Sequence, residues 1–243
     1  MKIKTGTGVI ALLTLIAIWS ISAITSLPGL AVSPILGKLH LIFPHASDLE
    51  IQQLTSLPSL LTIPFVLLSG FLSVKKDKMS LLIAGLALFL VSGAAYFFAK
   101  SMLALIVISC ILGAGAGIVI PLSTGLIADV FTGKYRTKQL GLSSSINNVT
   151  LVLATFVTGM LATVNWHLPF IVYMIPAISL ILIFAARKDI SRNSQAQQES
   201  EADRKQPFTA EQKLKILKLM GIYFILTHLV LVIVYNLPFS IQE

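Results

Sequence analysis

The chain has 243 residues, of which 56% are hydrophobic and 12% are charged, and its formal net charge is +8. Soluble domains carry about 25% charged residues, so this composition, sorted into long uncharged runs, excludes a water-soluble globular protein. The basic residues stand in short clusters between apolar runs, which excludes the basic face that binds nucleic acid, and the single Cys110 excludes a disulfide framework.

Seven apolar segments are long enough to cross a membrane as helices. A hydrocarbon core of ~30 Å needs about 20 apolar residues per helix, and lipid requires that every backbone polar group be paired, which favours helices at this length. The first segment is too long for a signal peptide and no small-x-small cleavage site follows it. In chain order the predicted spans are 8–28, 53–72, 80–99, 102–127, 139–163, 168–186 and 218–237.

The loop charges orient these spans. With a cytoplasmic N-terminus, all Lys and Arg residues except Lys38 and Lys100 fall on the cytoplasmic side, as the positive-inside rule requires. A missed or false span would invert every later loop and spoil this distribution. We therefore predict a multi-pass protein of the bacterial cytoplasmic (inner) membrane, with the lipid bilayer as its surroundings and the N-terminus inside.

Three parts follow from the distribution of polar residues. Residues 1–186 are predicted to form an N-terminal six-helix transmembrane bundle, so the fold class is an all-α membrane protein. Residues 187–217 are mostly polar with mixed charge, which predicts a disordered or loosely helical cytoplasmic linker. Residues 218–243 hold a seventh transmembrane helix, which we expect to begin an incomplete C-terminal half.

Three segments have the pattern of a known transporter family. The loop at 70–78 reads Gly-Phe-Leu-Ser-Val-Lys-Lys-Asp-Lys, the fourth span contains Gly-Ala-Gly-Ala-Gly-Ile-Val-Ile-Pro-Leu-Ser at 113–123, and 165–170 reads Asn-Trp-His-Leu-Pro-Phe. Together with six spans, a linker and a seventh span, they resemble the major facilitator superfamily across the whole chain. The resemblance implies two six-helix halves that rock about a site at the membrane midplane.

The sequence departs from that family's pattern at several positions. Val74 stands where the loop at 70–78 should carry an acidic residue that helps to hold the two halves together, and Asp77 could substitute in a shifted register. Ser109 replaces the arginine that many drug/proton antiporters have in the fourth helix, and Ala154-Thr155 replaces their Gly-Pro pair in the fifth. The resemblance is therefore to the superfamily rather than to its antiporters.

A stripe of small residues marks the fourth span. Gly113, Gly117, Pro121 and Gly125 recur every four residues and share one helix face. Small residues let helix backbones approach closely in lipid, where packing holds helices together. We expect the stripe to pack against a neighbouring helix, with direct contact to a substrate as the alternative.

Polar and aromatic residues at membrane depth are candidates for a substrate cavity. Asn147 and Asn148 in the fifth span need partners, which a cavity or a neighbouring helix could supply. Trp19 and Tyr173 could form an aromatic wall, or pack in the core. His228 is the titratable residue near the middle of the seventh span, where it could transfer protons or hydrogen-bond a neighbouring helix.

A second candidate site is a charge cluster at the inner face. Asp129 lies at the end of the fourth span, close in sequence to Arg136, and Lys75 and Asp77 follow the second span. We expect these four residues to gather at the cytoplasmic side in a structural or gating role. Exposed ion pairs contribute only about 0–1 kcal/mol each.

The apolar spans decide the class of substrate that we expect. The first six spans hold no carboxylate and no basic residue at mid-depth, and such groups usually mark ion or proton paths. A coupling carboxylate would then lie in the other half. We predict a secondary transporter of a small, neutral or lipophilic solute, with drug efflux as one form of it, completed by the missing C-terminal half or by a second copy.

The alternative is a truncated or non-transporting membrane scaffold or subunit without carrier activity. An enzyme is not expected, because no nucleophile arrangement or phosphate-cradling loop occurs, and the glycines at 113–117 lie in a helix without a βαβ unit. No metal-ligand spacing is present. We predict neither a metal nor a cofactor.

Overall fold

The computed structural model describes residues 2–6, 8–28, 30, 32–75 and 77–202, together with 211, 214, 215, 217–222, 225 and 226 of the C-terminal part. The chain divides into two compact units, Met1–Ser200 and Glu201–Glu243.

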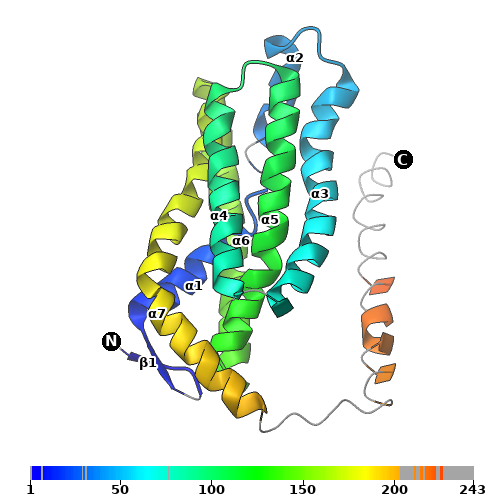
Figure 1. Ribbon diagram of the computed structural model, residues 1–243. Coiled ribbons are helices and arrows are strands. Elements are labelled where there is room, and N and C mark those ends of the chain that lie inside the picture. The colour runs from blue at the N-terminus through cyan, green and yellow to red at the C-terminus, as the bar shows by residue number, and fades with distance from the viewer. Residues whose placement is uncertain are drawn as a thin grey trace, which may run out of the picture. The chain divides into compact units, whose positions relative to one another are not determined.

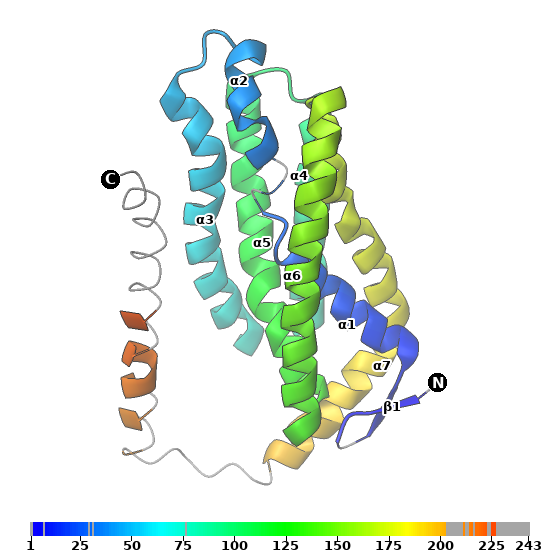
Figure 2. The ribbon, with the colours of Figure 1, turned by 180° about the vertical axis from the view of Figure 1, so that it is seen from behind.

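Five helices of the described chain are long and apolar enough to cross a membrane. They confirm the second to sixth predicted spans, and in Figures 1 and 2 the helices α3 to α6 run side by side along the bundle. Short 3-10 segments, η2 and η3, continue α4 and precede α7. The bounds are α3 Asp48–Lys75, α4 Lys78–Ala95, η2 Tyr96–Phe98, α5 Met102–Val130, α6 Gly133–Val164, η3 Leu168–Met174 and α7 Ile175–Ala202.

The expectation of one continuous helix over 8–28 is wrong. The chain begins with a two-stranded antiparallel hairpin, β1 Lys2–Lys4 and β2 Val9–Ala11. Helix α1 follows over Leu12–Ile24, and its 13 residues span about 20 Å, less than the hydrocarbon core. The next helical elements are η1 Ser33–Ile35 and α2 Leu36–Ile42.

The residues after Ile24 explain why α1 ends there. Pro28 has no N–H to donate and disfavours helical backbone at the residue before it. The hydroxyl of Thr25 donates to the carbonyl of Ser22 at 2.7 Å, and that of Ser26 donates to Ala23 at 3.1 Å. Such local bonds compete with the helix ladder, so the backbone turns, with the N–H of Leu27 donating to Ile24.

Helix α5 is the centre of the bundle, because glycines bring two neighbours close to it. A Cβ built at Gly113 would lie 2.7 Å from Cα of Pro58, and one built at Gly117 would lie 2.7 Å from the carbonyl oxygen of Thr62, so this face packs on α3. A Cβ at Gly115 would lie 2.9 Å from the backbone nitrogen of Phe89 in α4. Gly113 and Gly117 thus lie at the contact with α3, and Gly115 at the contact with α4.

The rest of the predicted stripe behaves differently. A Cβ at Gly125 would meet no heavy atom within 4 Å, so Gly125 does not belong to the close helix contact. Pro121 lies within α5 itself. The contact is instead reinforced where α3 carries Pro58, because the hydroxyl of Thr62 donates to the carbonyl of Pro58 at 2.8 Å and also lies 3.2 Å from the carbonyl of Gly113.

An aromatic core joins α4, η2 and η3. The rings of Tyr96 and Phe170 stack at 4.3 Å between centroids, and Tyr173 contacts both Tyr96 and Phe89. The side chains of Tyr96 and Tyr173 are at most 1% exposed. Stacked and edge-on aromatic pairs of this kind contribute about 0.5–1.5 kcal/mol beyond their buried area.

Helix α7 does not end at the membrane boundary expected near residue 186. It continues through the first part of the predicted linker to Ala202, so that part is helical. In the C-terminal unit the described residues between 211 and 226 are also helical. His228 and the remainder of the predicted seventh span from residue 227 lie outside the described residues.

Candidate functional site

A row of hydrogen bonds joins α1 to α6. The indole nitrogen of Trp19 donates to Oε1 of Gln139 at 3.0 Å, the hydroxyl of Ser143 donates to Oγ of Ser22 at 2.6 Å, and Nδ2 of Asn147 donates to Oγ1 of Thr25 at 2.7 Å. Oγ of Ser22 also lies 3.5 Å from Oγ of Ser123 in α5. We call this row the polar seam; it comprises Trp19, Ser22, Thr25, Ser123, Gln139, Ser143 and Asn147.

Helical spacing explains how the seam forms. Residues 139, 143 and 147 recur every four positions and therefore lie on one face of α6, while 19, 22 and 25 recur every three positions at the end of α1. Gln139 is 7% exposed and Ser22 is 1% exposed. Buried amides and hydroxyls in lipid need such partners, and the two sets supply them to each other without any charged group.

The structure separates the predicted cavity residues. Trp19 and Asn147 both belong to the polar seam and are half-buried, whereas Asn148 is exposed and donates to the carbonyl of Ser144 on its own helix at 2.9 Å. Tyr173 lies in the aromatic core, fully buried. Trp19 and Tyr173 therefore lie in different parts of the bundle and do not form the predicted aromatic wall.

The charged residues Asp77, Lys78, Asp129 and Arg187 lie at one end of the bundle, which we call the basic end. Nζ of Lys78 donates to both carboxylate oxygens of Asp129, at 2.6 and 2.9 Å. Beside this pair is a cavity of about 290 Å³ between α3, α4, α5 and α7. Its lining residues are Ser73, Val74, Asp77, Lys78, Met79, Leu126, Asp129, Ile190, Ser191, Ser194 and Gln195.

Asp77 has two functions at the basic end. It is the N-cap of α4, accepting from the N–H groups of Met79 and Ser80, and it lies 3.6 Å from the guanidinium of Arg187 in α7. Partial burial opposes ionisation, but the bonds from Ser80 and Met79 and the charge of Arg187 prevail and lower the pKa of Asp77. Asp77 thus joins α4 to α7.

The other two members of the predicted charge cluster are placed differently. The guanidinium of Arg136 donates to the carbonyls of Phe131 and Ala128 at 2.8 Å each, which satisfies carbonyl groups at the end of α5. Among the described side chains, Lys78 contacts Asp129, and Lys78 was not a member of the predicted charge cluster. The side chain of Lys75 lies outside the described part of the chain.

Several residues of the polar seam and of the basic end were not predicted from the sequence. Gln139, Ser143, Ser22 and Thr25 carry a detectable signal, because polar residues three or four positions apart within apolar segments share a helix face. The pairing of Lys78 with Asp129 carries none, since the two residues are 51 positions apart. Among the described residues, no group of three or more His, Cys, Asp or Glu side chains is placed to hold a metal ion.

A family model decides the classification. The model of the Major Facilitator Superfamily matches residues 9–242. The chain belongs to this superfamily. Within it, this member has an uncharged polar seam between α1 and α6. Its segment 70–78 contributes Asp77 and Lys78 to contacts with α7 and α5.

Two curated members of the superfamily are similar to part of the chain. The multidrug transporter protein MdtP of Bacillus subtilis (strain 168) is 31% identical over 106 residues, which are 43% of this chain and 19% of that protein. The quinolone resistance protein NorA of Staphylococcus aureus (strain MRSA252) is 35% identical over 101 residues, 42% of this chain and 26% of that protein. The matches thus cover about a fifth to a quarter of each relative's length.

Proposed function

We propose that this chain contains the first six-helix half of a secondary transporter, followed by a linker and a seventh transmembrane helix, and that the transporter moves a small, neutral or lipophilic solute by alternating access. Membership of the superfamily and the similarity to MdtP and NorA support a transport function, including drug efflux. The basic end would face the cytoplasm of a bacterial inner membrane, because cytoplasmic loops are enriched in Lys and Arg. The N-terminus would then also be cytoplasmic.

The composition of the polar seam carries the proposal for the substrate. Its members offer an indole, amides and hydroxyls but no carboxylate or basic group. A permanently charged solute at this depth would lack a counter-charge, which is costly in lipid. Trp19 and Asn147 would contact the solute at the half-exposed edge of the seam, and the exposed Asn148 would lie beside them on α6.

A partner would complete the site. Asn148 is exposed, and its hydrogen bond to the carbonyl of Ser144 uses one of its several donor and acceptor positions. Water or another protein surface suits the rest of this amide better than lipid does. The second six-helix half, or a second copy of the chain, would provide that surface, and the charged residues of the basic end would then act in gating.

Dye export from bacterial cells tests the proposal. Efflux-deficient cells that express the chain would be loaded with Nile red, a neutral lipophilic dye, or with ethidium, a permanent cation. We expect faster loss of Nile red than from cells with an empty vector, and little difference for ethidium. The substitutions Trp19→Phe and Asn147→Leu should reduce the rate of Nile red loss, because they remove polar groups of the seam.

A matched substitution separates a site effect from a folding effect. Leu153→Ala changes a side chain on α6 that is 59% exposed and outside the seam, so it should leave the export rate unchanged. Export of ethidium but not of Nile red would contradict the neutral substrate. Equal retention of both dyes with and without the folded chain would favour a non-transporting scaffold.

A further inference from the structure

The hairpin that precedes α1 has a tightly specified turn. The N–H of Thr5 donates to the carbonyl of Gly8 at 2.9 Å, and the N–H of Gly8 donates to Oγ1 of Thr5 at 2.9 Å. Gly6 has a φ of +105°, a conformation that favours glycine. An isolated two-stranded hairpin is marginally stable in water, so its order here must come from what it packs against.

The hairpin packs against two other segments of the bundle. The N–H of Thr132, at the junction of α5 and α6, donates to the carbonyl of Thr5 at 2.9 Å. On the other side, a Cβ built at Gly8 would lie 3.1 Å from Oδ1 of Asn193 in α7. Thr5 is 0% exposed and Ile10 is 1% exposed, so the hairpin is buried against the protein.

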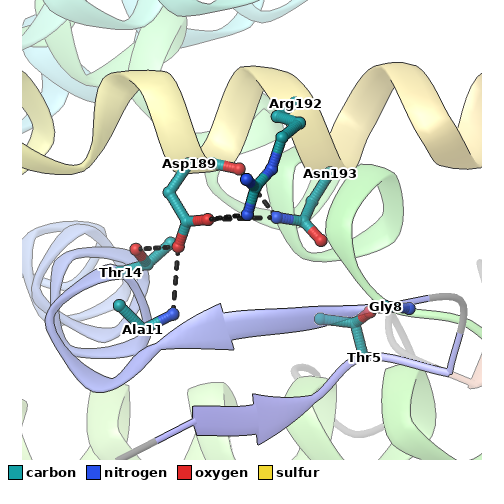
Figure 3. Close-up of polar contacts among 7 residues, drawn as sticks. All are labelled: Thr5, Gly8, Ala11, Thr14, Asp189, Arg192 and Asn193. Atoms are coloured by element: carbon teal, nitrogen blue, oxygen red, sulfur yellow. Dashed lines mark hydrogen bonds and ion pairs between the residues drawn. The ribbon is translucent and has the colours of Figure 1, made fainter.

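Asp189 of α7 contacts the chain at the point where the hairpin ends and α1 begins, which we call the joint (Figure 3). Its Oδ2 accepts from the N–H of Ala11 at 3.0 Å and from the hydroxyl of Thr14 at 2.7 Å. Ala11 is the N-cap residue of α1 and has no side-chain cap of its own. A carboxylate at this position satisfies an otherwise free N–H and complements the positive end of the helix.

Interactions within α7 hold the Asp189 carboxylate in place. Its Oδ1 lies 3.2 Å from the guanidinium of Arg192 and accepts from Nδ2 of Asn193 at 3.3 Å. The carboxylate therefore uses one oxygen for its own helix and the other for α1. Next to this joint is a cavity of about 440 Å³, lined by Val9, Ile10, Ala11, Leu13, Thr14, Ala185, Ala186, Asp189 and Arg192.

We propose that the hairpin of β1 and β2 forms a strap between the polar end of α7 and the start of α1, and that Asp189 is the residue that holds this strap in place. Helix α1 is short and ends at Ile24, so its beginning is where it can be fixed relative to α7. Asp189 is thereby a positioning residue: through α1 it sets the place of Trp19, Ser22 and Thr25 in the polar seam. The strap does not depend on the chemical class of the transported solute.

Disulfide trapping tests whether Asp189 holds the strap. In the full chain with Cys110→Ser, the pair Gly8→Cys and Asn193→Cys should form a disulfide rapidly under mild oxidation, because the two positions are in contact. Asp189→Leu should slow its formation roughly two- to ten-fold, since charge-assisted hydrogen bonds are lost. Asp189→Glu should restore most of the rate.

A second measurement reports on the position of α1. In a Trp166→Phe background, Trp19 is the remaining tryptophan, and its emission should shift to the red in Asp189→Leu as the bond to Gln139 loosens. Asp77→Asn removes the carboxylate at the start of α4 that contacts Arg187 of α7, and it should change neither measurement. If Asp189→Leu does not fold, Thr14→Val retains the charge, removes one bond, and should show the same changes at smaller size.

The proposal is overturned if disulfide formation and Trp19 emission in folded Asp189→Leu match those of the parent. It is equally overturned if Asp77→Asn slows disulfide formation as much as Asp189→Leu does, because the effect would then be a general loosening of α7.

Discussion

The outward faces of α3 and α6 differ from those of α4 and α7. Within the apolar stretches, exposed residues of α3 and α6 include polar side chains, whereas the exposed residues of α4 after Ser80 and of α7 before Arg187 are apolar. In the most apolar part of each helix, only 11% of the residues of α3 and 17% of those of α6 are buried. The corresponding share is 39% in each of the segments that contain α4 and α7. The exposed polar residues include Gln52, Ser56, Ser59, Ser144, Ser145, Asn148, Thr155 and Thr163; the apolar ones include Val91, Ile178, Ile181 and Phe184.

This difference indicates which faces are built for lipid. Hydroxyls such as those of Ser59 and Thr155 donate to carbonyls of the preceding turn, at 3.0 and 2.7 Å, so they tolerate an apolar environment. The amides of Gln52 and Asn148 have more donor and acceptor positions than such a bond uses. The exposed faces of α4 and α7 are therefore suited to lipid, whereas α3 and α6 combine exposed apolar side chains with polar positions that are better suited to water or to another protein surface.

The largest expected effect comes from placing a carboxylate on the two kinds of face. Ile178→Asp in α7 should cost about 2.5–3.5 kcal/mol, the insertion cost of an acidic residue at the centre of a helix. Asn148→Asp in α6 should cost much less, because this exposed position already carries a polar amide. The yield of monodisperse protein in size-exclusion chromatography measures both, and equal losses would remove the distinction between the faces.

The close contact of α3 with α5 can be broken at a glycine. Gly113→Leu would push a side chain into the backbone of Pro58, and overpacking of this kind costs about 1–3 kcal/mol. Gly125→Leu has open space and serves as the matched control. The melting temperatures in detergent should differ clearly, and a similar drop for both variants would show that α3 is held elsewhere.

The attachment of α6 to α1 depends on interhelical hydrogen bonds. Gln139→Leu leaves the indole N–H of Trp19 without its acceptor and should cost about 0.6–2 kcal/mol, the range for such bonds in membranes. Gln52→Leu changes the same residue type at an exposed site on α3 and should be near neutral. Thermal unfolding of the two variants gives the comparison, and a loss as large in Gln52→Leu would argue against a special role of the seam.

The smallest effect is expected at the joint of α4 and α7. Asp77→Asn keeps a good N-cap residue but loses one acceptor oxygen and the attraction to Arg187. For the ion pair about 0–1 kcal/mol is expected, because the Asp77 side chain is 57% exposed. Because its pKa is lowered in the folded chain, the stabilisation is complete above the ordinary carboxyl pKa of about 3.9. It is lost as the pH falls through the lower folded value.

Melting temperatures of the parent and of Asp77→Asn between pH 7 and pH 3 test this sign. The difference between the two proteins should be constant near neutral pH and should shrink at the acid end. A difference that grows as the pH falls would mean that the carboxylate is destabilised in the folded chain.

Much of the fold was predictable because the relevant signals are local. Hydropathy and length place the spans that became α3 to α7, since each helix must satisfy its own backbone in lipid. The same signals failed at 8–28, where apolar composition is continuous but Thr25, Ser26 and Pro28 end the helix. They also failed at residue 186, because a polar helix such as the end of α7 has no apolar run to mark it.

The candidate sites depended more on tertiary structure. The sequence by itself determined that the protein is a membrane-spanning helical bundle with an uncharged interior. It pointed to Trp19 and Asn147 as candidates for a substrate cavity, and to Asn147 as an amide that needs partners. Only the fold decided that these residues bond Gln139 and Thr25, that Lys78 meets Asp129, and that Asp189 holds the start of α1. A side chain's need for a partner is a property of its chemistry, whereas the identity of the partner depends on which helices pack together.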